Sequence, residues 1–251
     1  MEVRKINSNK IRLDSLLVER GLVKSRQHAQ ALIMGGKVSA GGRVITKAGA
    51  ATDPGSEINI SEDLPYVGRG GKKLEGALDG FNIDVGGLTV MDVGASTGGF
   101  TDCLLKMGAA KVHAVDVGRG LMDFRLRSDG RVHLIEGRNI RYLGAEEVGE
   151  KVDMACIDVS FISLKKVIPR VKEFLKPSGR VLALIKPQFE VGRFEVGKGG
   201  VVRDGEKHRR VIEDIESFSV KEGLTPLGVV ESQVKGRKGN KEFWLYLSCG
   251  A

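Results

Sequence analysis

From Leu88 to the end of the chain, short apolar runs alternate with longer amphipathic stretches. The runs predict strands and the stretches predict helices. Strands and helices that alternate in this way form a mostly parallel, doubly wound sheet, so we expect a Rossmann-like α/β fold. The predicted strands are 88–93, 111–116, 132–135, 153–158 and 180–185, the predicted helices are 98–107, 164–175 and 206–222, and 227–233 and 243–248 predict a closing antiparallel pair.

A glycine-rich segment, Asp92–Phe100, follows the first of these strands and opens the first helix. A dinucleotide fingerprint would need glycine where Ser96 stands, because that side chain crowds the approach of a pyrophosphate, so NAD is disfavoured. Gly94–Gly98 also matches the nucleophile elbow of α/β-hydrolases, and Asp158 and His208 follow in the right order. The usual preceding sheet has no room before it, so a hydrolase is disfavoured as well.

The third interpretation of this loop is S-adenosylmethionine. That cofactor carries no phosphate, so small residues can pass beneath its methionine moiety, and amides at the helix start suit its carboxylate. Asp116 ends the second strand, where an acid would accept the ribose hydroxyls, and Asn139 lies where adenine usually sits or is a plain turn residue. The candidate cofactor-binding residues are Gly94, Ser96, Thr97, Gly98, Gly99, Phe100, Asp116, Asn139 and Asp158.

The first 62 residues follow a different pattern. Leu13–Gly21 and Ser25–Gly36 predict two short helices, and Gly41–Gly42 predicts a two-residue hairpin. A turn at Asp53–Gly55 leads into a strand at Ile58–Ile60. Such a short segment makes only a small core, which suits a recognition module better than an enzyme.

The net charge of +8 indicates a polyanionic partner. Residues 1–62 hold ten Lys and Arg against six Asp and Glu, so a quarter of the chain supplies half of the excess. The pattern SRxxAxxLIxxGxVxxxG, from Ser25 to Gly42, resembles the RNA-binding domain first known in ribosomal protein S4. The resemblance implies a face that contacts RNA phosphates, although ordinary solvated charges are the alternative. Its candidate residues are Lys24, Arg26, His28, Lys37 and Arg43.

Residues 63–87 connect this module to the α/β part. The basic, glycine-rich stretch Gly68–Lys73 reads as a flexible linker, and a short helix is predicted over Lys73–Asp79. Arg69, in this stretch, is a further candidate for RNA contact.

Four charged residues stand at strand ends or in loops, where burial beside a substrate is expected. They are Lys73, Asp158, Lys186 and Glu242. Taken singly, each is explained equally well by an ion pair or a solvated charge.

Several motifs together resemble the TlyA-type (hemolysin A) family of ribosomal RNA ribose 2′-O-methyltransferases. They are RGxxKL at 69–74, DVGxSTGGFT at 92–101, DVSF at 158–161, KPQFE at 186–190 and GNxE at 239–242. The resemblance covers nearly the whole chain. It implies an S4-type RNA-binding domain at 1–62, a linker and first helix at 63–87, and an FtsJ-like methyltransferase domain with S-adenosylmethionine at 88–251, acting on a cytidine of ribosomal RNA. It also implies a catalytic tetrad of Lys73, Asp158, Lys186 and Glu242.

Methyl transfer to a ribose hydroxyl needs such a set of charged residues, because the hydroxyl is a poor nucleophile. The sulfonium methyl is already activated. Catalysis is then mainly positioning plus removal or stabilisation of one proton. Our hypothesis is that Lys186 accepts that proton or stabilises the alkoxide, Asp158 and Glu242 fix its ammonium, and Lys73 helps to hold the hydroxyl. The residues leave both roles of Lys186 open, because the carboxylates favour its charged form whereas burial and a second lysine disfavour it.

Other features limit the setting. Apolar runs reach about five residues, so we expect no membrane span, and the three scattered cysteines and four scattered histidines favour a reducing cytoplasm and no metal. We expect a monomer that works on ribosomal subunits, with residues 190–210 as a basic active-site loop. Two alternatives stay open: a catalytically silent RNA-binding assembly factor, and a membrane-active hemolysin. The target nucleotide, and whether one or both subunits carry it, do not follow from the sequence.

Overall fold

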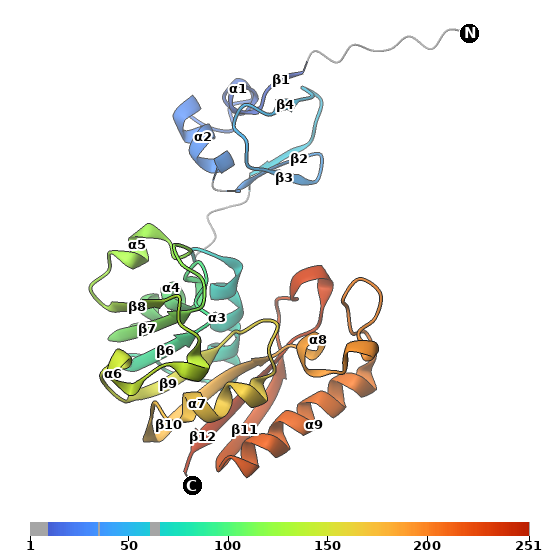
Figure 1. Ribbon diagram of the computed structural model, residues 1–251. Helices are drawn as coiled ribbons and strands as arrows, with labels where there is room; N and C mark the ends of the chain where they lie inside the picture. Colours follow the sequence, from blue (N-terminus) through green and yellow to red (C-terminus); the bar gives the residue numbers. More distant parts are fainter. Residues whose placement is uncertain (1–9, 35, 61–65, 251) are drawn as a thin grey trace. The chain divides into compact units, whose positions relative to one another are not determined.

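The computed structural model (Figure 1) describes residues 10–34, 36–60 and 66–250. The chain separates into two units, residues 1–64 and 65–251, each with its own core. Each unit is described by itself below.

The small unit combines two helices with short strands, as the turn signals predict. Its helices are α1 (Leu13–Glu19) and α2 (Arg26–Met34), and its strands are β1 (Ile11–Arg12), β2 (Val38–Ala40), β3 (Arg43–Ile45), β4 (Ala51–Thr52) and β5 (Ile58–Ile60). The predicted hairpin joins β2 to β3, and β5 pairs with the other edge of β2. Ser25 caps α2 by accepting a hydrogen bond from the amide of His28 at 3.2 Å. Leu13, Leu17 and Ile33 are fully buried between these elements.

The large unit is built on a seven-stranded sheet in the order β11-β12-β10-β9-β6-β7-β8. The strands are β6 (Thr89–Val93), β7 (Lys111–Asp116), β8 (Val132–Glu136), β9 (Val152–Ile157), β10 (Leu175–Ile185), β11 (Leu224–Glu231) and β12 (Phe243–Cys249). The five strands from β6 to β10 run parallel, while β12 pairs antiparallel with both β10 and β11. The predicted doubly wound α/β class and its closing antiparallel pair are therefore confirmed.

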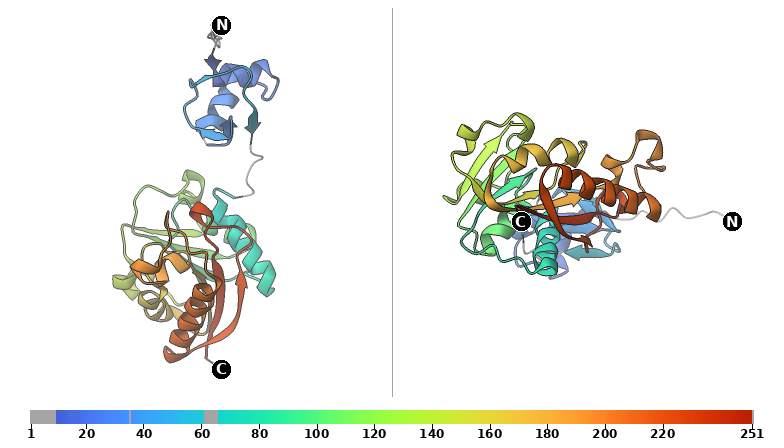
Figure 2. Two further views of the ribbon diagram at one scale, coloured as in Figure 1. Left: turned by 90° about the vertical axis from the view of Figure 1, so that its right-hand side faces the viewer. Right: turned by 90° about the horizontal axis from the view of Figure 1, so that it is seen from below.

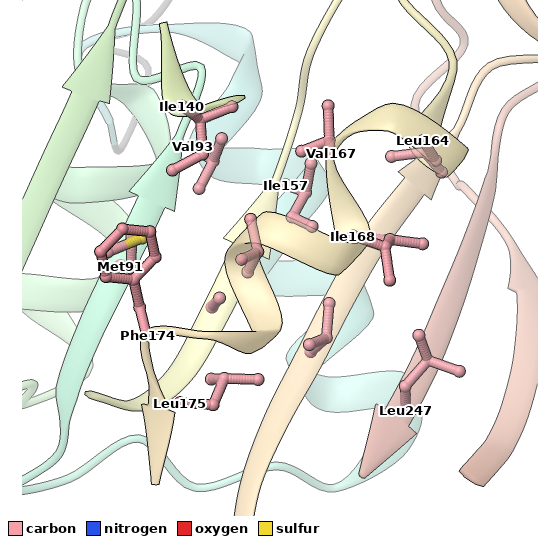
Figure 3. Packing of buried hydrophobic residues seen from close by; sticks show 14 of the residues in the cluster. Met91, Val93, Ile140, Ile157, Leu164, Val167, Ile168, Phe174, Leu175 and Leu247 are labelled. Atoms are coloured by element: carbon pink, nitrogen blue, oxygen red, sulfur yellow. The ribbon is translucent and has the colours of Figure 1, made fainter. Parts of the chain in front are cut away.

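Helices cover both faces of this sheet (Figure 2). The helices are α3 (Arg69–Phe81), α4 (Gly99–Lys106), α5 (Phe124–Arg127), α6 (Ala145–Val148), α7 (Ile168–Lys172), α8 (Pro187–Glu190) and α9 (Gly205–Lys221), and the 3₁₀ turns are η1 (Ile140–Tyr142), η2 (Leu164–Lys166), η3 (Arg193–Glu195) and η4 (Arg237–Gly239). Because side chains alternate along a strand, β12 sends Trp244 into the core beneath α3 and α4, and Leu245 into the core beneath α7 and α9. Figure 3 shows the second of these cores, where Ile157 and Ile168 pack between α7 and the sheet.

Two predicted helices have different bounds. The predicted helix 164–175 is instead the turn η2 followed by the five-residue α7, and β10 already begins at Leu175. Pro169 stands in the first turn of α7, where its missing amide costs no hydrogen bond. The predicted helix Lys73–Asp79 begins four residues earlier, so the glycine-rich stretch is the first turn of α3 and not a flexible linker.

Candidate functional site

The glycine loop after β6 is drawn tightly against the end of β9. Gly94 has a φ of +92°, and a Cβ there would lie 2.5 Å from the carbonyl oxygen of Asp158. Only glycine fits both conditions. The loop therefore passes directly beside the backbone of Asp158, with Ser96 in a left-handed conformation (φ 50°) at its turn.

A cavity of about 470 Å³ opens beside this loop, at the carboxyl ends of the parallel strands. Gly94, Ser96, Asp116, Asn139 and Asp158 all line it, so the structure brings together five of the nine cofactor candidates. Ligands of open α/β sheets bind at this edge. The sequence-based choice of the loop and of the acid that ends β7 thus leads to one cavity.

The groups in this cavity suit an uncharged nucleoside better than a phosphate. Both carboxylate oxygens of Asp116 accept backbone hydrogen bonds at 2.7 Å, from the amides of Ser96 and Gly118. Each oxygen retains a second lone pair for a ribose hydroxyl. Asn139 accepts from the amide of Arg141 at 3.1 Å, so it is at least a turn residue, and it also lines the cavity. These residues fit the nucleoside part of S-adenosylmethionine.

The remaining cofactor candidates lie at the start of α4. Thr97, Gly99 and Phe100 line a second cavity of about 500 Å³, whereas Gly98 caps α4 and lines neither cavity. A Cβ at Gly99 would lie 3.0 Å from the amide nitrogen of Gly71, which shows how closely α3 approaches the loop. This approach places Arg69 and Lys73 in the wall of the second cavity.

All four tetrad candidates line the second cavity, where they form two ion pairs. Lys73 Nζ lies 2.5 Å from Glu242 Oε2, and these side chains are 12% and 3% exposed. Lys186 Nζ lies 2.5 Å from Asp158 Oδ1, with side chains 10% and 20% exposed. At this burial, each charge is stabilised chiefly by its partner, since water screens it little.

The pairing differs from the expected one in one respect. We expected Asp158 and Glu242 to fix Lys186 together, but the ion pair that Glu242 makes is with Lys73. Lys186 has Ser160 as its further partner and donates to its hydroxyl at 3.0 Å. The sequence did not indicate Ser160 as a partner of Lys186, although this serine stands inside the DVSF motif.

The loop before β12 fixes Glu242 through Asn240. The side-chain amide of Asn240 donates to the carbonyl of Gly200 at 3.0 Å, and its oxygen accepts from the amide of Val202 at 3.1 Å. Asn240 is 3% exposed. It therefore joins the segment before α9 to the loop that carries Glu242.

Two residues of the KPQFE motif had no assigned role. Gln188 lines the second cavity, and its buried Oε1 has no hydrogen-bond partner among the described residues. Glu190 accepts hydrogen bonds from Ser163 and Leu164. The sequence signal that could have indicated both residues is their position, two and four residues after Lys186.

The candidates for RNA contact lie in both units. In the small unit, Lys24, Arg26, His28 and Arg43 are exposed and Lys37 is partly exposed. Arg26 also has an internal partner, because its Nε lies 3.1 Å from the buried Asp14. Arg69 belongs to the large unit, at the rim of the second cavity.

Two features bear on the other expectations. Among the described residues, no cluster of His, Cys, Asp and Glu could hold a metal ion. No described helix is both long enough and apolar enough to cross a membrane.

Comparisons with known proteins agree with this geometry. The family model "FtsJ-like methyltransferase" matches residues 66–249, and the model "S4 domain" matches residues 11–58. The 16S/23S rRNA (cytidine-2′-O)-methyltransferase TlyA of Mycobacterium tuberculosis is 41% identical over 96% of this chain and 90% of its own length. YqxC of Bacillus subtilis is 43% identical over 96% of this chain and 87% of its own. A solved structure from Streptococcus thermophilus aligns with a TM-score of 0.75 and 41% identity, over 96% of this chain and 89% of that one.

Proposed function

The chain belongs to the FtsJ-like methyltransferase family, and we propose that it methylates the 2′-hydroxyl of a cytidine in ribosomal RNA. S-adenosylmethionine, the methyl donor of this family, supplies an activated methyl group when it is bound. One observation carries the proposal. The cavity with two lysine–carboxylate pairs shares Gly94, Ser96 and Asp158 with the cavity that fits a nucleoside.

The shared wall sets the geometry of the reaction. A ribose placed in the second cavity faces the tetrad, and Asp158 also lines the first cavity. The 2′-oxygen forms a bond to the methyl carbon as the sulfur–methyl bond breaks, and the hydroxyl proton must leave. Holding these atoms in line supplies most of the rate acceleration.

Lys186 and Lys73 have separate tasks in this arrangement. Asp158 and Ser160 orient the ammonium of Lys186, which stabilises the negative charge that develops on the 2′-oxygen. Lys73, fixed by Glu242, helps to hold the hydroxyl. The hydroxyl proton passes to water when Lys186 is charged, and only a neutral Lys186 could accept it.

The small unit supplies affinity for the ribosome. Its exposed cations contact RNA phosphates, which binds the substrate without reading much sequence. We also propose that the enzyme acts as a monomer in the cytoplasm, where ribosomal subunits are assembled.

The test uses S-adenosylmethionine with a tritiated methyl group and purified 30S and 50S subunits from a strain that lacks the enzyme. We expect label in an alkali-stable dinucleotide, which marks a 2′-O-methyl ribose, with cytidine as the labelled nucleoside. Lys186→Ala should lose the label while it still binds S-adenosylmethionine in calorimetry. Lys221→Ala, which removes an exposed lysine at the end of α9, serves as the matched control. If wild-type protein binds the subunits but labels neither, the silent assembly factor is the better interpretation.

A further inference from the structure

Two loops carry most of the second cavity's chemistry, and a partly buried carboxylate joins them. One loop, residues 158–164, follows β9 and holds Asp158 and Ser160. The other, residues 186–190, follows β10, holds Lys186 and includes the short helix α8. We propose that Glu190 is a positioning residue for methyl transfer, which clamps the first loop onto the second and thereby keeps Asp158 and Lys186 in register. This inference rests on the proposed function.

The clamp uses both oxygens of Glu190. Its Oε2 accepts from the hydroxyl of Ser163 at 2.6 Å, and its Oε1 accepts from the amide of Leu164 at 2.9 Å. Leu164 is 1% exposed in the core, and Val191 packs against the same core. Both ends of the clamp are therefore anchored, so the two hydrogen bonds fix the distance between the loops.

Between the clamp and the ends of the strands, each loop presents functional groups toward the other. Lys186 contacts Asp158 and Ser160, and the rings of Phe161 and Phe189 lie 4.9 Å apart. Phe161 is 87% exposed and has a φ of 63°, so its own burial does not hold the first loop in place. A shift of this loop would move Asp158 and Ser160 relative to the ammonium.

Stability alone does not explain a carboxylate at this position. Burial raises the pKa of Glu190, because removal from water disfavours its charged form even with two donors present. The cost of removing the carboxylate from water opposes the gain from its two hydrogen bonds, so its net contribution to stability is small. The benefit of Glu190 is then the geometry that its two hydrogen bonds impose.

Two substitutions at Glu190 test whether its hydrogen bonds, rather than its charge or its side-chain volume, support catalysis. Glu190→Met keeps the length but accepts no hydrogen bond from Ser163 or Leu164. Glu190→Gln loses the charge but keeps both bonds, because its oxygen accepts from Leu164 and its amide donates to the Ser163 hydroxyl. We expect Glu190→Met to lower kcat by about 10- to 100-fold, as for a misplaced catalytic group. Its KM for the subunit should hardly change, and its Tm should fall because the amide of Leu164 loses its acceptor. Glu190→Gln should restore most of kcat and of the Tm.

Ser163→Ala tests the path of the effect. If Glu190 acts through Ser163, this variant loses part of kcat, and adding it to Glu190→Met causes no further loss. Glu213→Met on α9, which replaces an exposed glutamate, is the matched control and should keep wild-type kcat.

Several results would overturn the inference. One is a kcat for Glu190→Met within twofold of wild type. Another is a fall in the kcat of Glu190→Met that is fully explained by a smaller fraction of protein that binds S-adenosylhomocysteine. The third is a Glu190→Gln variant that is as inactive as Glu190→Met. Hydrogen exchange of residues 158–164 tests the clamp without turnover, and we expect faster exchange in Glu190→Met only. If wild-type protein labels neither subunit but this exchange pattern appears, the proposed function fails and the clamp stands.

Discussion

Asp14 in the small unit and Asp158 in the large unit each face cations, yet their surroundings differ. Asp14 is completely buried and accepts hydrogen bonds from Arg12, Arg26 and Gln30. Asp158 is one-fifth exposed, has Lys186 as its ion-pair partner, and lines two cavities. One cluster is closed by the protein itself, and the other opens onto space for ligands.

The difference separates stability from function. In the small unit, both arginines expose about half of their side chains, so the free-energy cost of removing them from water is small. Together they saturate a buried carboxylate. In the large unit, the paired groups face a cavity that a ribose can enter. Saturated clusters stabilise a fold, whereas charged groups that adjoin a cavity can serve catalysis. Replacing each aspartate by asparagine tests this comparison.

The largest effect is expected for Asp158→Asn. The amide no longer holds the ammonium of Lys186, so we expect kcat to fall by about 10³-fold, within the range for acid–base groups and equal to about 4 kcal/mol of transition-state stabilisation. The Tm should fall as well, because the substitution leaves the largely buried ammonium of Lys186 without its carboxylate partner. Methylation of purified subunits and calorimetry give the two quantities. A variant with lower Tm and unchanged kcat would reverse the comparison.

The next effect is expected for Asp14→Asn. The arginines then face a neutral acceptor, and one acceptor becomes a donor that faces an arginine, so the small unit should lose about 2 kcal/mol of stability. Hydrogen exchange of the full chain under increasing urea would show this in peptides from residues 11–60 and not in the large unit. The kcat at saturating subunit concentration should not change.

The same carboxylate makes the small unit sensitive to acid. Hydrogen bonding from Arg12 holds the pKa of Asp14 well below its ordinary value. A lowered folded pKa means that the stabilisation is complete above the unfolded pKa of about 3.9 and is lost as the pH falls toward the folded pKa. In Asp14→Asn this pH dependence should disappear. An unchanged acid transition would mean that other groups dominate it.

Much of the fold follows from the sequence because its signals are local. The alternation of apolar runs predicts the parallel strands, and the turn glycines predict the hairpin of the small unit. The start of α3 could not be predicted, because Gly70–Gly71 are poor helix formers and favour a linker. Their helical conformation depends on contact with α4, which lies about 30 residues further along the chain.

The sequence indicates the four tetrad candidates that line the second cavity, but not how they pair. Strand ends and motifs indicate Lys73, Asp158, Lys186 and Glu242, but no spacing tells which lysine meets which carboxylate. Glu242 lies 169 residues from Lys73, and the order of strands in the sheet brings them together. The role of Arg26 inside the small unit could not be predicted either, because an arginine in a basic segment looks like any RNA-binding cation.

A third aspartate sharpens the comparison, because it is as buried as Asp14 but far less saturated. Asp92 lies in β6 under the glycine loop and is 0% exposed. Its Oδ2 accepts from the hydroxyl of Thr101 at 2.7 Å, and its Oδ1 has no hydrogen-bond partner among the described residues. Burial raises its pKa to about 7. Asp92 should therefore change the stability of the large unit near neutral pH, where Asp14 does not titrate.

The sign of this effect is opposite to that of Asp14. A folded pKa raised above the unfolded value means that the stabilisation is complete below about pH 3.9 and is lost as the pH rises through about 7. Between pH 6 and pH 8 the folded state releases the proton, which costs about 1.4 kcal/mol. The single tryptophan, Trp244, is buried in the large unit, so its fluorescence reports urea unfolding of that unit. Asp92→Asn keeps the shape without the titration, and we expect its stability to fall less than that of wild type over this range. Parallel losses in both proteins would assign the titration to another group, and Asp92 would then resemble Asp14 in being fully compensated.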